Sequence, residues 1–114
     1  MRAILIGGIP GSGKTTLAKR LVNQEESILI DDPHLFCSDV LPYIGYNLVI
    51  TDPHFCSSGV RNLAKERLLK EGYIVFEILL IAPPDICWER IKLRNDGRKI
   101  MREELDYFYA RLNS

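Results

Sequence analysis

The sequence predicts an α/β fold with three layers, in which helices cover both faces of a parallel sheet. Four apolar, β-branched runs favour strands over residues 2–6, 27–30, 48–51 and 73–81. None of these runs alternates cleanly with polar residues, a pattern typical of parallel strands buried on both faces. Helical patterns separate the runs, so strands and helices alternate as in βαβ units with right-handed crossovers.

Each intervening helix has its own signal. The first is expected over 15–23, directly after a glycine-rich segment, and the second between a cap at Ser57 or Ser58 and a stop at Gly72. Asp85 is expected to cap the third. The last helix is predicted from an apolar stripe at helical spacing, formed by Met101, Leu105, Phe108 and Leu112.

Length and composition limit the classes of protein to consider. The 114 residues predict a single domain, 1–114, and 15 basic side chains balance 15 acidic ones. Zero net charge argues against non-specific binding to nucleic acid or membranes as the main task. Three widely spaced cysteines argue against a disulfide framework, and the apolar runs are too short for a membrane span, so we expect a cytoplasmic protein.

One segment repeats at an offset of twenty residues. Residues 28–34 and 48–54 both read as a short apolar strand that ends in Asp-Pro-His. One interpretation is that each Asp-Pro only ends a strand and begins a turn. The other is that two parallel strands bring Asp32 and Asp52 to the same carboxyl edge, where open α/β sheets bind ligands.

The segment from Gly8 to Thr15 matches the phosphate-binding pattern G-x-x-x-x-G-K-[ST] in full. Its glycines let backbone N–H groups approach a phosphate, and the following helix directs its positive dipole end there. Lys14 would neutralise the β- and γ-phosphates, and the Thr15 hydroxyl would bind Mg²⁺. The expected nucleotide-binding residues are Gly8, Pro10, Gly11, Ser12, Gly13, Lys14, Thr15 and Thr16.

A phosphate-binding loop indicates nucleotide binding but leaves the reaction open. Asp52, which follows the strand at 48–51, is the expected second group for Mg²⁺. The sequence has no N-K-x-D segment for a switch GTPase and too little length for a motor ATPase. The arrangement that remains is that of a small kinase, which closes a cationic lid over the phosphates. Six basic side chains and one acidic side chain between Arg90 and Arg102 suit such a lid.

These residues resemble the 5′-kinase domain of phage-type polynucleotide kinases, within the wider group of P-loop kinases. The resemblance covers the loop through Thr16, the pair Asp31-Asp32, Asp52, and a lid at about 94–100 that begins Arg94-Asn95-Asp96-Gly97-Arg98. It implies a sheet of order 2-3-1-4, with ATP and Mg²⁺ as cofactors. Asp31 would be the general base, although the internal repeat pairs Asp32 with Asp52 instead. Arg94 and Arg98 would be catalytic lid arginines.

The resemblance implies transfer of the γ-phosphate of ATP to a hydroxyl, first of all a nucleic-acid or nucleotide 5′-hydroxyl. The sequence departs from the family between Asp32 and Asp52, an interval that is short and contains no Lys or Arg. A small-metabolite hydroxyl is therefore the alternative acceptor. A nucleotide-binding regulatory module without turnover is the alternative of another class.

Overall fold

A parallel four-stranded sheet forms the centre of the protein in the computed structural model, which describes residues 1–33, 36–94 and 100–112. Its strands are β1 (Arg2–Gly7), β2 (Ile28–Asp31), β3 (Leu48–Thr51) and β4 (Ile74–Leu79). They lie in the order β2-β3-β1-β4 with every pair parallel. The predicted fold class and strand order are confirmed.

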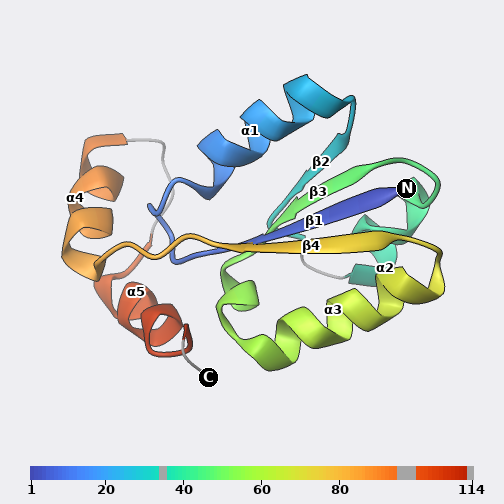
Figure 1. Ribbon diagram of the computed structural model, residues 1–114. Helices are drawn as coiled ribbons and strands as arrows, with labels where there is room; N and C mark the ends of the chain where they lie inside the picture. The colour runs from blue at the N-terminus through green and yellow to red at the C-terminus, as the bar shows by residue number, and fades with distance from the viewer. Residues whose placement is uncertain (34–35, 95–99, 113–114) are drawn as a thin grey trace.

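Helices lie on both faces of the sheet and at one end of it (Figure 1). The helix α1 (Lys14–Glu25) covers one face, and α3 (Ser58–Lys70) lies across the other, near the short α2 (Phe36–Asp39). The helices α4 (Pro84–Arg94) and α5 (Arg102–Tyr109) pack together beyond the end of the sheet. Two 3₁₀ turns, η1 (Leu41–Tyr43) and η2 (Pro53–Cys56), complete the elements. Within the described ranges, no helix is long and apolar enough to span a membrane.

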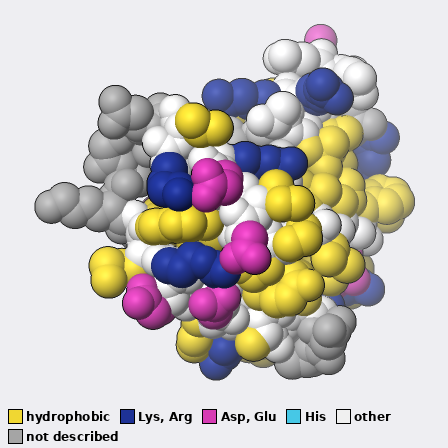
Figure 2. Space-filling view, turned by 90° about the vertical axis from the view of Figure 1, so that its left-hand side faces the viewer, with side chains coloured by type: hydrophobic (Ala, Val, Ile, Leu, Met, Phe, Trp, Pro, Cys, Tyr) yellow, Lys and Arg dark blue, Asp and Glu magenta, His cyan; other side chains and the backbone are white. Residues whose placement is uncertain are grey.

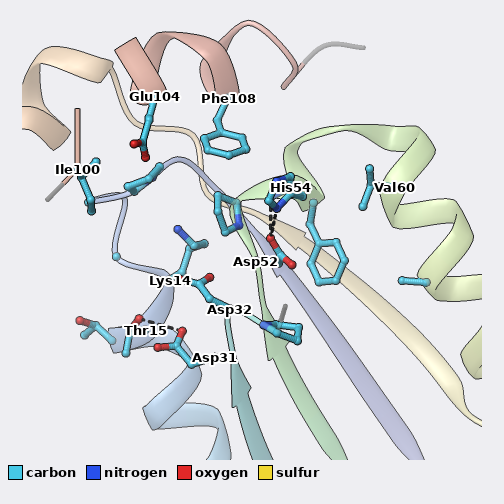
Figure 3. Close-up of a pocket in the computed structure, with 18 of the residues that line it drawn as sticks. Lys14, Thr15, Asp31, Asp32, Asp52, His54, Val60, Ile100, Glu104 and Phe108 are labelled. Carbon is cyan, nitrogen blue, oxygen red and sulfur yellow. Dashed lines mark hydrogen bonds and ion pairs between the residues drawn. The ribbon is translucent and has the colours of Figure 1, made fainter. Parts of the chain in front are cut away.

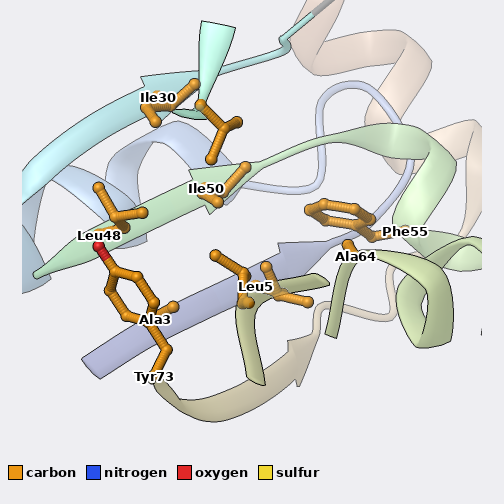
Figure 4. Close-up of a cluster of buried hydrophobic side chains, with 10 residues drawn as sticks. Ala3, Leu5, Ile30, Leu48, Ile50, Phe55, Ala64 and Tyr73 are labelled. Carbon is orange, nitrogen blue, oxygen red and sulfur yellow. The ribbon is translucent and has the colours of Figure 1, made fainter. Parts of the chain in front are cut away.

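The two faces of the sheet bury separate apolar clusters, as alternate side chains of a strand must. Leu5 and Ile50 point toward α3 and pack with Phe55, Ala64 and their neighbours (Figure 4). Ile4, Ile6 and Val49 point to the other face, where they pack against α1 through Ala18. This packing on both sides fixes the strands whose carboxyl ends carry the predicted site.

The expectation of strands buried on both faces is wrong for β4. Ile74 and Phe76 are 61% and 49% exposed. Among the described residues β4 pairs only with β1, so it is an edge strand, and part of its surface remains in contact with solvent. An apolar run alone does not distinguish an edge strand from a central one.

Two helix predictions need correction. Asp85 lies inside the first turn of α4 instead of capping it, and its carboxylate accepts a 2.6 Å hydrogen bond from Arg102 Nη2. In the last helix Leu105, Phe108 and Leu112 are buried as predicted, but Met101 is 60% exposed because it precedes α5 as its N-cap residue.

Positive and negative side chains alternate on the end of the molecule formed by α4 and α5 (Figure 2). Arg102 contacts Asp85 and also Asp106, at 2.8 Å, and Lys92 contacts Glu89 at 2.8 Å. The basic residues of this segment are thus partly neutralised by ion pairs. Arg98 lies outside the described residues, as does the side chain of Arg94, the last residue of α4.

Candidate active site

The phosphate-binding loop runs from the end of β1 to the start of α1 at Lys14, in the context that its pattern predicts. Gly11 and Gly13 have φ of +84° and +100°, a region that glycine adopts without strain. A Cβ on Gly11 would lie 2.7 Å from the carbonyl oxygen of Cys87 in α4. Glycine is therefore required at Gly11 both for the turn and for the close approach of α4.

The start of α1 suits an anion. Its N-cap residue is Gly13, which has no side chain to accept the first N–H groups of the helix. Such unpaired N–H groups, together with the positive end of the helix dipole, are what binds phosphate at helix N-termini. The loop and the helix therefore present donors to the same space.

Lys14 is buried at the base of this loop. Its Nζ donates a 3.2 Å hydrogen bond to the carbonyl oxygen of Ile9, and the residue is 8% exposed. Burial lowers the pKa of the Lys14 ammonium, and the negative charges of Asp32, Asp31 and Asp52 partly oppose that effect. A buried cation beside a cradle of N–H groups is suited to a polyanion such as a triphosphate.

The internal sequence repeat corresponds to the register of two neighbouring strands. Ile28 is opposite Leu48 and Asp31 is opposite Thr51, so the offset of twenty residues is the pairing of β2 with β3. Asp32 and Asp52 then follow at the same carboxyl edge. Both aspartates therefore lie at one edge of the sheet, as the repeat predicts, and the 3₁₀ turn η2 follows Asp52.

Asp31 lies between two threonine hydroxyls. Its Oδ1 accepts a hydrogen bond from Thr51 Oγ1, and Thr15 Oγ1 lies 3.5 Å from the same oxygen (Figure 3). The hydroxyl expected to bind Mg²⁺ therefore faces Asp31. Asp32, the next residue, has φ of +50° and lies beside Lys14.

Asp52 forms an interaction that the sequence analysis did not predict. Its Oδ1 accepts the backbone N–H of His54 at 2.9 Å and lies 2.8 Å from Nδ1 of the same residue. Because a carboxylate only accepts, the Nδ1 atom carries the proton in this bond. The His54 ring then meets the edge of Phe108 in α5, with ring centroids 5.1 Å apart. The Asp-x-His spacing at the start of η2 was the available signal.

These groups surround a cavity of about 1130 Å³ (Figure 3). Most of the predicted site residues line it, namely Pro10, Gly11, Gly13, Lys14, Thr15, Thr16, Asp31 and Asp52. Val60 and Leu63, two apolar residues of α3, are exposed and also line the cavity. Among the described residues, no three His, Cys, Asp or Glu side chains are grouped so that they could hold a metal by themselves.

A second hollow, of about 570 Å³, lies against the loop and includes Ser12, Arg20 and Arg90. Arg90 Nη1 donates a 3.2 Å hydrogen bond to the carbonyl oxygen of Gly11, which joins α4 to the loop. Arg90 was recognised in the sequence only as part of the cationic segment. Gly8 and Ser12 lie in the loop but do not line the larger cavity.

Solved structures with a similar fold include two kinases. A gluconokinase from Sinorhizobium meliloti 1021 aligns with 99% of this chain and 75% of its own, at a TM-score of 0.70 and 14% identity. A deoxyadenosine kinase from M. mycoides with bound dATP aligns with 98% of this chain and 82% of its own, at a TM-score of 0.61 and 12% identity. A protein described as APE1195 aligns with 98% of this chain and 77% of its own, at a TM-score of 0.58 and 20% identity. No protein-family model and no curated protein matches the sequence.

At these identities the likeness shows the fold. The chain has the three-layer P-loop kinase fold of the gluconokinase and nucleoside kinase type. The resemblance to phage polynucleotide kinases in particular stays a prediction.

Proposed function

We propose that this protein is a P-loop kinase that transfers the γ-phosphate of ATP to the hydroxyl of a small molecule. The observation that carries the proposal is the meeting of Lys14, Thr15, Asp31 and Asp52 around one cavity, at the carboxyl edge of the sheet. These residues come from three separate segments of the chain. A purely structural turn would not require a buried ammonium beside them.

The residues present fit ATP and Mg²⁺. The loop and Lys14 would hold the β- and γ-phosphates, and the oxygen donors Thr15 and Asp52 suit a hard cation such as Mg²⁺. When bound, Mg²⁺ neutralises charge on the transferring phosphoryl group. Asp52 also holds His54, so its carboxylate would serve both the turn and the metal.

Asp31 would act as the general base. As the acceptor oxygen forms its bond to the γ-phosphorus and the bond to ADP breaks, the hydroxyl proton moves to the Asp31 carboxylate. The threonine hydroxyls of Thr15 and Thr51 hold that carboxylate in place. Arg94 and Arg98 remain the proposed lid arginines.

Two features favour a small acceptor over a nucleic-acid 5′-hydroxyl. Lys14 is the only Lys or Arg among the described residues that line the cavity. The basic side chains at the α4–α5 end are interleaved with acids and partly paired with them (Figure 2). A bound polynucleotide needs a continuous basic path for its phosphates.

The test is a calorimetric titration of Mg-ATP, followed by transfer from γ-labelled ATP to 5′-hydroxyl oligonucleotides, nucleosides and sugar alcohols. Lys14→Ala should abolish nucleotide binding, whereas Lys19→Ala, an exposed lysine on the next turn of α1, should not. Label on a small acceptor supports the proposal. Label only on oligonucleotides would restore the polynucleotide kinase interpretation, and ATP binding without any transfer would favour a regulatory module.

A further inference from the structure

The cavity has a second wall that the phosphate-binding loop does not explain. It is formed by η2, α3 and α5 and is largely apolar. Phe55 and Phe108 line it although they are largely buried, while Val60 and Leu63 are 37% and 70% exposed. Exposed apolar side chains that line a cavity beside polar groups are typical of a site for an organic ligand.

Acidic side chains outnumber basic ones around the cavity as a whole. Among the described lining residues, the acidic side chains are Asp31, Asp32, Asp52 and Glu104, and Lys14 is the one lysine or arginine. Lys14 is assigned to the nucleotide. Among these described residues, an anionic acceptor would therefore meet four carboxylates and no second lysine or arginine, which like-charge repulsion opposes.

Two of the described arginines on the elements of this wall are engaged elsewhere, and a third, Arg67 of α3, does not line the cavity. Arg61 of α3 donates to the carbonyl oxygens of Phe55 and Cys56, at 2.7 and 3.0 Å, and so holds η2 against α3. Arg102 of α5 contacts Asp85 and Asp106. Neither side chain lines the cavity.

Glu104 gives the wall its polarity. It lies one turn before Phe108 on α5, and both side chains extend toward the cavity (Figure 3). A carboxylate and an aromatic ring on the same helix face would match a ligand with a cationic or hydrogen-bond-donating group attached to an apolar body. Glu103, its neighbour, is exposed and does not line the cavity.

We infer that the acceptor half of the cavity selects alcohols that carry no anionic group and that present an apolar or aromatic body to α3 and α5. The inference rests on the proposed kinase function, because that function assigns Lys14 to ATP. It deepens the proposal by naming the acceptor as an uncharged or cationic alcohol, in contrast to a sugar acid or a phosphorylated compound.

The experiment compares alcohols of related carbon skeleton that differ in charge. Binding is measured by titration in the presence of Mg²⁺ and a saturating non-hydrolysable ATP analogue. The pairs are thymidine with thymidine 3′-monophosphate, phenylalaninol with phenyllactate, and glucosamine with gluconate. We expect at least one uncharged or cationic member to bind about tenfold or more tightly than its anionic partner, with no pair reversed. A reversed pair, less than a tenfold difference in every pair, or no binding by any uncharged or cationic member would overturn the inference.

Two pairs of variants locate the effect. Glu104→Lys should reduce the preference about tenfold, and Glu103→Lys should leave it unchanged. Leu63→Ser should weaken binding of the preferred alcohol, while Leu69→Ser, exposed on the same helix but outside the cavity lining, should not. If the two variants of either pair have equal effects on binding of the alcohol, the assignment of this wall to the acceptor is wrong. Binding of the ATP analogue, measured first in each titration, reports separately on the proposed function.

Discussion

Thr15 and Asp31, sixteen residues apart in sequence, face one another, with Thr15 Oγ1 3.5 Å from Asp31 Oδ1. This contact joins the start of α1 to the end of β2. It places the proposed proton acceptor beside the hydroxyl that is proposed to bind the metal. In the proposed function, the nucleotide and acceptor parts of the site meet at this point.

The first prediction concerns the base. Asp31→Asn should keep ATP binding and lower turnover by a factor of roughly 10² to 10⁴, because an amide can accept from the threonines but cannot take a proton. Single-turnover transfer and calorimetry measure the two effects. Asp32→Asn is the matched control. If Asp32→Asn is the inactive variant and Asp31→Asn is not, then Asp32 is the base.

A second prediction separates two roles of Asp52. Asp52→Ala removes the acceptor for the His54 N–H and should cost about 1 kcal/mol in the free energy of unfolding, as loss of a cap typically does. Asp52→Asn keeps an acceptor oxygen, so its stability should stay close to wild type while its Mg²⁺ requirement rises. Urea denaturation and Mg²⁺ titration of activity give the two readouts. An unchanged Mg²⁺ dependence in Asp52→Asn would remove the metal role.

A third prediction concerns the loop glycine. Gly11→Ala should destabilise the protein more than Gly45→Ala. Both residues have positive φ, but an added Cβ meets the Cys87 carbonyl only at Gly11 and nothing within 4 Å at Gly45. Gly45→Ala should therefore carry only the backbone cost of a positive φ, about 1–2 kcal/mol, and Gly11→Ala should in addition shift α4 and weaken nucleotide binding. Equal losses in thermal denaturation would show that the contact with α4 is unimportant.

The buried lysine should make stability depend on pH. Because burial lowers the pKa of Lys14, the folded chain binds fewer protons than the unfolded chain between that lowered pKa and the ordinary value of 10.5. The free energy of unfolding therefore increases as the pH rises through this interval. Below the interval Lys14 is charged in both states, and the full cost of burying its charge lowers the free energy of unfolding.

Lys14→Met should remove that contribution. The variant should unfold a few degrees higher than wild type at neutral pH in the absence of nucleotide, and the difference should shrink as the pH approaches 10.5. Thermal denaturation across this pH range measures it. A variant less stable than wild type at neutral pH would show that the carboxylates around Lys14 outweigh its burial.

Much of this site could be predicted from the sequence because its signals are local. The glycine pattern, the strand before it and the helix after it are contiguous, and the repeat at an offset of twenty already contained the register of β2 against β3. The pairing of Asp52 with His54 depends on a short 3₁₀ turn, which has no apolar periodicity to reveal it.

Exposure was less predictable, since it depends on neighbours that are distant in sequence. The sequence shows that Val60 and Leu63 are apolar, but it does not show that they line a cavity. They do so because η2 and α5 lie on the same side of α3. The same holds for β4, whose exposure follows from having one described partner strand. The proposed acceptor half of the site could therefore be recognised only from the fold, whereas the proposed nucleotide half could be recognised from the sequence.

The most direct test of the central claim is phosphorus NMR of Mg-ATP incubated with the protein and the preferred alcohol. Wild type should convert ATP to ADP and a phosphomonoester in equal amounts, and Lys14→Ala should produce neither. Release of inorganic phosphate in place of the phosphomonoester, or persistence of ATP with the wild-type protein, would contradict the account.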